Sequence, residues 1–163
     1  MKNNRVSQLK KASRAILERG ERGAIPDYFS PAYVVHVTGQ DLAGGHELIR
    51  HVVELYQRAF TKITTTVEIL AQQGDRVSWQ RTLRATQRGP FKGFPPSHRR
   101  IVWREMLTSR FEDHLIVEEW FLTDLAEQLL LARKSADRRG RGSRPASVRP
   151  PRRATANQAS TPH

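Results

Sequence analysis

The sequence predicts an α+β fold in which a curved, mostly antiparallel sheet wraps round N-terminal helices as a cone-shaped barrel. Helical periodicity is concentrated before residue 60, and four strand-like runs then follow one another. Consecutive strands favour hairpins, whereas a parallel sheet needs helices between its strands. Long, twisted strands can curl round the helices and leave a conical pocket. A chain of 163 residues favours one domain with a full core.

The N-terminal segment has the pattern of an amphipathic helix. Residues 5–19 repeat apolar side chains at helical spacing, with the basic residues largely elsewhere. Gly20 and Gly23 end this helix. Residues 26–29 suit a short helical turn, which Pro31 stops. We therefore expect a surface helix that covers the sheet, followed by a tight turn.

A β-branched run over residues 32–38 predicts the first strand. Its alternation places Tyr33 on one face and His36 on the other. His36 is a polar residue in an apolar run, so it is either a hydrogen-bonded core histidine or a catalytic one. A loop over residues 38–45 leads to a second amphipathic helix over residues 46–60. The apolar stripe of that helix suits a core and could also form one wall of a cavity.

The rest of the folded part is rich in strands. Alternating and β-branched runs predict four strands and a closing helix, over residues 63–70, 76–87, 101–111, 115–122 and 124–133. The last hairpin ends in a tryptophan-bearing strand, and a carboxylate, Asp124, stands just past it. Asp124 would favour the N-terminus of the closing helix, and Thr123 is an equally good capping residue.

The charge of the chain is uneven. From residue 132 onward there are nine Lys/Arg and one Asp, which is +8 of the formal +12 and leaves +4 for residues 1–131. We therefore expect a folded domain over residues 1–133 and a disordered, basic Arg/Pro-rich tail over residues 134–163. The tail could bind polyanions loosely, but the mildly basic domain predicts no specific nucleic-acid partner.

Several classes of site and location are excluded or disfavoured. The chain has no cysteine, so disulfides, thiolate metal sites and cysteine nucleophiles are excluded. The histidines are scattered, and no phosphate loop, dinucleotide fingerprint or GxSxG motif is present, so we expect no metal site. No apolar run reaches the roughly 18–20 residues of a membrane span. The N-terminus lacks the apolar block of a signal peptide, and a cytoplasmic protein is expected.

An ordered set of motifs resembles the SnoaL-like polyketide cyclases, also called ester cyclases, of the nuclear transport factor 2-like superfamily. The resemblance covers roughly residues 5–133. It rests on a histidine before a glycine loop, a GDRV turn, a Gly/Pro-rich loop and a final strand ending in WxxxD. These are His36 with Gly44, residues 74–77, residues 85–98, and Arg110 with Asp113, Ile116, Glu118, Trp120 and Asp124.

The resemblance implies a cofactor-free enzyme that uses an aspartate as general acid/base. By motif this aspartate is Asp124. The assisting histidine of the family is replaced by Arg110, which cannot act as a base but could stabilise an enolate or alkoxide. His36 is the third catalytic candidate. The histidine of the family's GTH motif is replaced by Gln87. For Asp124 the interpretation as a helix N-terminal carboxylate also remains open.

The implied reaction is an intramolecular aldol cyclisation of a polyketide-type or other small carbonyl substrate. Alternatives are epoxide hydrolysis or isomerisation on the same fold, a non-catalytic module that binds a small molecule, and an interaction protein recruited by its tail. The superfamily also implies a homodimer through the open face of the sheet. Candidate substrate-binding residues are Trp120, Gln87, Phe91, Phe94, Tyr33 and Tyr56.

Overall fold

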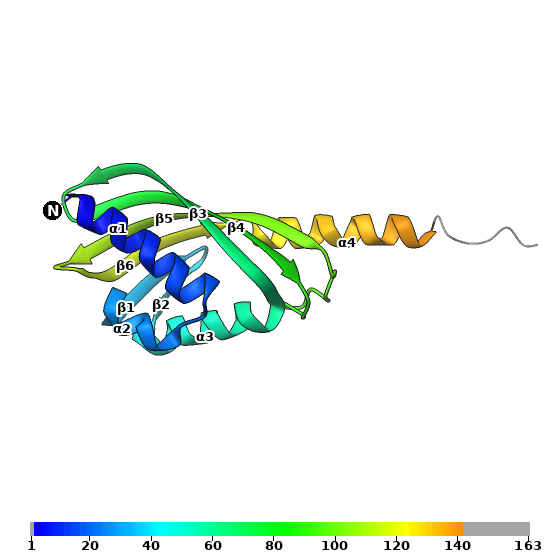
Figure 1. Cartoon of the computed structure of the whole chain (residues 1–163), viewed down its shortest axis with the longest axis horizontal. Coiled ribbons are helices and arrows are strands. Elements are labelled where there is room, and N and C mark those ends of the chain that lie inside the picture. The colour runs from blue at the N-terminus through cyan, green and yellow to red at the C-terminus, as the bar shows by residue number, and fades with distance from the viewer. Residues whose placement is uncertain (1, 142–163) are drawn as a thin grey trace, which may run out of the picture.

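A long, curved sheet packs over the N-terminal helices in the computed structural model, which describes residues 2–141 (Figure 1). The helical elements are α1 (Lys2–Ala12), a π-helical continuation (Ser13–Glu18), a 3-10 turn (Arg22–Ala24), α2 (Ile25–Tyr28), α3 (Gly45–Ala59) and α4 (Leu125–Arg141). The strands are β1 (Phe29–Val37), β2 (Gln40–Ala43), β3 (Phe60–Gln73), β4 (Arg76–Gln87), β5 (Arg100–Glu112) and β6 (Leu115–Thr123).

The six strands form one sheet in the order β2-β1-β6-β5-β4-β3. Every neighbouring pair is antiparallel except β1 and β6, which run parallel. The predicted α+β class with a curved, mostly antiparallel sheet is therefore confirmed. The parallel pair brings the first strand of the chain beside the last. Residues that are far apart in the sequence, such as His36 and Trp120, thus become neighbours.

Two regions differ from the sequence prediction. The expected loop over residues 38–45 contains the short strand β2, which pairs with β1 from Val34 to Val37. The closing helix does not end at residue 133 but continues to Arg141. Residues such as Lys134 and Ala136 have good helix propensity, so the helix propagates past the last turn that packs on the core. The expected disorder of the remaining tail concerns residues 142–163, which lie outside the described part of the chain.

The core lies between the concave face of the sheet and the helices. Alternate residues of β5 are buried from Ile101 to Phe111, as the strand period of two requires. Leu9 and Ile16 of the N-terminal helix are buried, and so is Val53 of α3. Full burial of such side chains contributes about 1.5–3 kcal/mol each. None of the helices between residues 2 and 141 combines the length and apolar character needed to span a bilayer.

The loop between β4 and β5 is held against the end of α3. The backbone amide groups of Arg88 and Gly89 both donate to the carbonyl of Ala59, at 2.8 and 3.0 Å. A Cβ atom on Gly89 would lie 2.3 Å from the carbonyl oxygen of Arg58, so this close approach requires glycine. The loop therefore has a fixed place at one end of the sheet, where it carries Phe91 and Phe94 toward the core.

Candidate active site in the concave face

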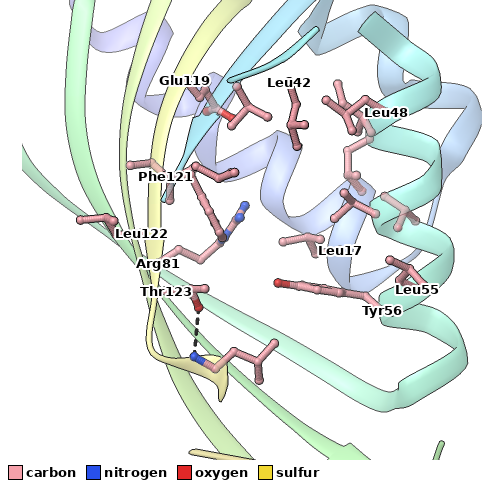
Figure 2. Close-up of a pocket in the computed structure, with 18 of the residues that line it drawn as sticks. Leu17, Leu42, Leu48, Leu55, Tyr56, Arg81, Glu119, Phe121, Leu122 and Thr123 are labelled. Atoms are coloured by element: carbon pink, nitrogen blue, oxygen red, sulfur yellow. Dashed lines mark hydrogen bonds between the residues drawn. The ribbon is translucent and has the colours of Figure 1, made fainter. Parts of the chain in front are cut away.

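A cavity of about 460 Å³ lies between the concave face of the sheet and the helices (Figure 2). Strands β1, β4, β5 and β6 form one side, and α1, α3 and the start of α4 form the other. Most of its lining is aliphatic or aromatic, including Leu9, Ile16, Val53, Leu107, Phe121 and Leu129. An apolar cavity with a few polar groups is the usual form of a small-molecule site.

Two side chains of opposite charge face this cavity from neighbouring parts of the sheet. Arg81 lines it from β4 and Glu119 from β6. Figure 2 shows the Arg81 guanidinium reaching toward the middle of the cavity, with Glu119 further along the sheet. Among the residues described by the structure, Glu119 is the one acid in the lining. Its side chain is 6% exposed, so it is a candidate for acid/base chemistry in a dry environment.

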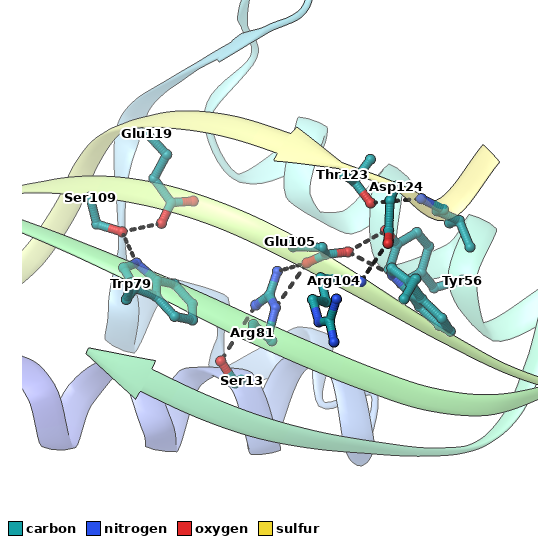
Figure 3. A network of polar contacts seen from close by, with 12 residues as sticks. Ser13, Tyr56, Trp79, Arg81, Arg104, Glu105, Ser109, Glu119, Thr123 and Asp124 are labelled. Carbon is teal, nitrogen blue, oxygen red and sulfur yellow. Dashed lines mark hydrogen bonds and ion pairs between the residues drawn. The ribbon is translucent and has the colours of Figure 1, made fainter. Parts of the chain in front are cut away.

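Glu119 is held by two hydroxyl groups. Ser109 lies directly opposite it in the β5–β6 register and donates to its Oε1 at 2.5 Å. The phenol of Tyr33 is 2.7 Å from Oε2. Ser109 in turn accepts a hydrogen bond of 2.9 Å from the indole N–H of Trp79. The carboxyl group is therefore fixed in place by neutral hydroxyls from β1 and β5. Figure 3 shows the contacts of Ser109 with Glu119 and with Trp79.

The surroundings of Glu119 favour its neutral form. Burial raises the pKa of its carboxyl group, and this outweighs the hydrogen bonds from Ser109 and Tyr33, which lower it. Burial also raises the pKa of the Tyr33 phenol well above its ordinary value, and the nearby charge of Glu119 adds to this. A carboxyl group with a raised pKa takes and returns protons near neutral pH more readily than an ordinary glutamate.

A second buried carboxylate, Glu105 on β5, has a different set of partners. It lies directly opposite Arg81 in the β4–β5 register. The Nε and Nη2 atoms of Arg81 both donate to its Oε2, the former at 2.9 Å. Its Oε1 accepts from Tyr56 at 2.8 Å and from the indole of Trp103 at 3.1 Å. Four donors, one pair of them on a guanidinium, therefore occupy Glu105 (Figure 3).

Glu105 also keeps Arg81 charged and oriented. Burial lowers the pKa of Arg81, but the charge and the hydrogen bonds of Glu105 outweigh it and raise the pKa overall. The third contact of the guanidinium is a long one, 3.4 Å from Nη1 to the hydroxyl of Ser13. An arginine has five N–H groups, so two remain without an acceptor among the described residues. Arg81 can therefore donate to an oxygen of a molecule in the cavity.

The motif-based acid/base candidate lies elsewhere. Asp124 is not in the cavity lining, although its neighbours Thr123 and Leu125 are. Its Oδ1 accepts the backbone N–H of Arg104 at 2.7 Å, and Oδ2 accepts from Gln128 at 3.3 Å. Asp124, the acid/base candidate that the motif indicates, therefore lies outside the lining of this cavity. The carboxylate ties the start of α4 to β5, while the hydroxyl of Thr123 accepts the backbone N–H of Leu125 at 3.2 Å.

The other two catalytic candidates lie on the opposite face of the sheet. His36 stands 2.7 Å from Asp41 and 2.8 Å from Glu118, and Arg110 donates to Glu118 at 2.7 Å. The ring of Trp120 stacks on His36 with centroids 4.9 Å apart. Neither His36, Arg110 nor Trp120 lines the cavity. These three candidates therefore lie outside the cavity of the concave face.

The pKa values on that face shift in the ordinary direction of ion pairs. The hydrogen bond of Asp41, with that of Glu118, raises the pKa of His36. Hydrogen bonds from Arg110 and His36 lower the pKa of Glu118. The hydrogen bonds that Arg110 makes to Glu112 and Glu118 raise the pKa of Arg110. These charges neutralise one another on a partly exposed surface, so they form a strand-linking cluster.

The remaining substrate-binding candidates differ in whether they line the cavity. Tyr33, Tyr56, Phe91 and Phe94 all line the cavity. Gln87 does not line it. Its side chain is buried and bonds the carbonyl of Pro95 at 3.1 Å and the amide of Ser97 at 3.2 Å. Gln87 therefore holds the loop that carries the two phenylalanines.

The inward-facing charged residues of the sheet left a signal in the sequence. Arg81 occupies the same strand parity as Trp79 and Leu83, and Glu105 that of Trp103 and Leu107. Charged residues at inward positions of alternating strands are costly unless they have a partner or a function. The alternation pattern is therefore a signal that could have indicated both residues. Glu119 follows a second glutamate, Glu118, in the sequence, and parity alone separates the two.

The described residues define a class of protein: a cone-shaped α+β domain with one buried carboxyl group and one guanidinium in an apolar cavity. The family profile of SnoaL-like polyketide cyclases matches residues 7–130, and the chain belongs to this family. A comparison with curated proteins gave no significant match. Within residues 2–141, no group of three or more potential metal-ligating side chains has the geometry to hold an ion.

Solved structures with this fold come from several bacteria. AclR from Streptomyces galilaeus, assigned as a hydroxylase, is 25% identical with a TM-score of 0.69, over 81% of this chain and 82% of that one. IdmH from Streptomyces antibioticus, assigned as a polyketide cyclase, is 25% identical with a TM-score of 0.66, over 79% and 97%. A protein from Acidithiobacillus ferrooxidans, also assigned as a polyketide cyclase, is 20% identical with a TM-score of 0.71, over 80% and 95%.

Proposed function

We propose that this protein is a cofactor-free cyclase that closes a ring in a polyketide-type or other small carbonyl substrate by an intramolecular aldol reaction. Glu119 is the general acid/base. The observation that carries the proposal is its carboxyl group, buried in an apolar cavity, held by two neutral hydroxyls and without an ion-pair partner in direct contact among the described residues. Family membership supports a cyclase-type role.

The proposed reaction begins with removal of a proton. Ionised Glu119 takes a proton from the carbon next to a substrate carbonyl, and the carbonyl oxygen gains negative charge as the enolate forms. The unused N–H groups of Arg81 would stabilise this oxygen, since a preoriented donor is most effective where charge develops in a water-poor site. The enolate carbon then attacks a second carbonyl of the same molecule. General acid/base groups of this kind contribute about 10²–10⁴-fold to a rate.

The apolar walls indicate the kind of substrate. Tyr33, Tyr56, Phe91 and Phe94 present aromatic surface to the cavity, and aliphatic residues fill most of the remainder. A flat aromatic or partly aromatic molecule with two carbonyl groups matches this lining. A cavity of about 460 Å³ is within the range of pockets for such ligands.

Proton exchange on a simple ketone tests the base. The probe is 2-acetylnaphthalene in D₂O, and mass spectrometry follows deuterium entering its methyl group. We expect the native protein to catalyse the exchange and Glu119→Gln to lose it by about 10²-fold or more. Glu118→Gln is the matched control, because the preceding carboxylate lies on the other face of the sheet.

Three outcomes decide this test. Exchange that survives Glu119→Gln and is lost in Asp124→Asn would return the catalytic role to Asp124. Equal loss in Glu118→Gln would remove the distinction between the two faces. Binding of the ketone with no exchange by the native protein would favour a binding module that converts nothing.

A second candidate function is epoxide opening. It is favoured by one observation, a guanidinium and a carboxyl group facing the same cavity, since an arginine can stabilise the opening alkoxide while a carboxylate attacks or activates water. Hydrolysis of 2-(naphthalen-2-yl)oxirane in H₂¹⁸O would test it. Release of a labelled diol by the native protein but not by an Arg81→Met variant that circular dichroism shows to be folded would support this candidate. An unchanged epoxide would exclude it for that probe.

The homodimer remains a proposal, based on the family and on the outer face of the sheet. Val102 and Met106 alternate with inward residues of β5 and are 43% and 49% exposed, so they offer apolar surface to a partner. Sedimentation velocity would measure the mass of the native protein and of Met106→Glu. We expect a dimer that the substitution weakens, and a native monomer would contradict the proposal.

A further inference from the structure

We propose that Tyr33 is a second catalytic residue. It donates a proton to the oxygen of the new alcohol and is then reprotonated by Glu119. The proposal rests on the proposed function and deepens it. It is carried by the directions in which the hydrogen bonds around Glu119 must run. Three elements far apart in the sequence supply those bonds: Tyr33 from β1, Trp79 from β4 and Ser109 from β5.

Trp79 fixes the direction of the first bond. An indole N–H is a donor and cannot accept, so Ser109 must be the acceptor in its 2.9 Å contact with Trp79. The single hydroxyl proton of Ser109 is then free to point the other way, toward Oε1 of Glu119. Ser109 is 0% exposed, and its hydroxyl contacts these two groups. Oε1 of Glu119 therefore has a permanent donor in contact with it.

This arrangement decides where Glu119 carries its proton. With a proton on Oε1, Ser109 would have to accept from both Trp79 and Glu119. Its own hydroxyl hydrogen would then be buried with no acceptor among the described residues, which is costly. Protonated Glu119 is therefore more stable with its hydrogen on Oε2, which lies 2.7 Å from the phenol oxygen of Tyr33. A phenol can donate or accept. Tyr33 donates to Oε2 when Glu119 is ionised and accepts from it when Glu119 is protonated.

Protonation of Glu119 thus frees the hydroxyl hydrogen of Tyr33. Once the phenol oxygen accepts from Oε2, its own hydrogen must turn to another acceptor. Tyr33 lines the cavity, so a substrate oxygen there can receive it. The two groups are therefore coupled. Tyr33 can donate a hydrogen bond to the substrate once Glu119 has taken a proton.

Proton transfer through Glu119 and Tyr33 accounts for every proton moved in an aldol ring closure. Glu119 removes the proton from carbon, which protonates Oε2 and leaves an enolate. The enolate carbon bonds to the second carbonyl carbon, whose C=O π-electrons become an alkoxide lone pair. Tyr33 gives its hydrogen to that alkoxide, and the proton on Oε2 passes to the phenol oxygen. Glu119 ends ionised, Tyr33 ends neutral, and the product has the atoms of the substrate.

Two probes separate the two residues. Exchange of the methyl protons of 2-acetylnaphthalene requires the base alone. Cleavage of 4-hydroxy-4-(6-methoxynaphthalen-2-yl)butan-2-one is an aldol reaction in reverse, and it releases a fluorescent aldehyde. By microscopic reversibility it needs both the proton path through Tyr33 and the carboxyl group of Glu119. Each rate is measured across pH and compared on its plateau, since loss of the Tyr33 hydrogen bond raises the pKa of Glu119.

We expect Tyr33→Phe to lower retro-aldol cleavage by about 10²-fold or more beyond its effect on proton exchange. Glu119→Gln should lose both reactions. Tyr28→Phe is the control for loss of a phenol, because Tyr28 does not line the cavity. Circular dichroism and thermal unfolding of each variant establish that it is folded.

The failures of the two proposals can be told apart. If Tyr33→Phe keeps both reactions while Glu119→Gln loses both, Tyr33 is not a proton donor and the proposed function stands. If the native protein catalyses neither reaction, the proposed function fails. If Tyr33→Phe is unstable, 3-fluorotyrosine in place of Tyr33 alters the acidity of the phenol at nearly constant shape. An unchanged pH profile for cleavage would then overturn the inference.

Discussion

Glu118 and Glu119 are consecutive residues of β6, yet their carboxyl groups have opposite surroundings. Glu118 lies on the outer face, where hydrogen bonds from Arg110 and His36 lower its pKa. Glu119 lies on the inner face, where burial raises its pKa. The two differ only in the direction in which a strand turns successive side chains. Strand parity therefore separates a strand-linking ion pair from a group suited to acid/base chemistry.

The same contrast applies to the two arginines. Arg81 on the inner face is 14% exposed and pairs with Glu105, whose side chain is 0% exposed. Arg110 on the outer face pairs with Glu118 at 26% and 23% exposure. Water screens the outer pair and is nearly absent from the inner one. The inner pair therefore stabilises the strands that form the cavity wall. The outer pair links β5 to β6 but contributes little to the free energy of unfolding.

The largest expected effect is the loss of Arg81. Arg81→Met leaves the charge of Glu105 buried without its cation, which should lower the free energy of unfolding by about 3–5 kcal/mol. Arg110→Met on the outer face should change it by less than about 1 kcal/mol. Urea unfolding at pH 7 measures both. Similar losses in the two variants would mean that the two faces do not differ as described.

The pH dependence of stability should differ in sign between the two glutamates. The pKa of folded Glu119 is raised above its ordinary 4.5, so the folded chain keeps a proton that the unfolded chain releases. Stability therefore falls as pH rises from 4.5 through the folded pKa. Glu119→Gln removes this loss and should raise the midpoint of unfolding at pH 7. The amide can still accept from Ser109 and donate to Tyr33.

Glu118 gives the opposite result. Its pKa is lowered from 4.5, so its contribution to stability is present above 4.5 and is lost as pH falls through the folded pKa. Glu118→Gln should therefore lower the midpoint at pH 7 and have no such effect in acid. Thermal unfolding at pH 3.5 and pH 7 measures both variants. Shifts of the same sign would contradict the contrast.

Asp124 should behave as an anchor of α4. Its carboxylate accepts the backbone N–H of Arg104 at 2.7 Å, so Asp124→Ala should lower the free energy of unfolding by about 1 kcal/mol, as loss of a typical hydrogen bond does. Hydrogen exchange of the Arg104 amide should also become faster. An unchanged Arg104 exchange rate would show that this bond does not form in solution.

The smallest expected effect concerns His36. Its pKa is raised from 6.5 by the hydrogen bond of Asp41 and that of Glu118. The stabilisation by protonated His36 is therefore complete below pH 6.5 and is lost as pH rises through the folded pKa. His36→Gln should flatten the change in stability across that window. Thermal unfolding at pH 6 and pH 8 measures it, and an unaltered pH dependence would exclude the pairing.

The sequence predicted the faces of the strands better than the site. Alternation placed Tyr33 and His36 on opposite faces, and the hydrophobic pattern located most strands. It could not show that Tyr33 lies beside Glu119, because that contact spans 86 positions and depends on the parallel pairing of β1 with β6. The WxxxD motif favoured Asp124, but Trp120 and Glu119 have opposite parity, so the tryptophan marks the outer face.

The measurement closest to the central claim is the titration of the glutamate carboxyl carbons by ¹³C NMR, with assignments from Glu118→Gln and Glu119→Gln. We predict that Glu119 titrates above 4.5, that Glu118 titrates below it, and that 2-acetylnaphthalene shifts the Glu119 signal and leaves that of Glu118 in place. A Glu119 signal that titrates at or below 4.5, or a ligand-induced shift at Glu118 instead, would contradict the account.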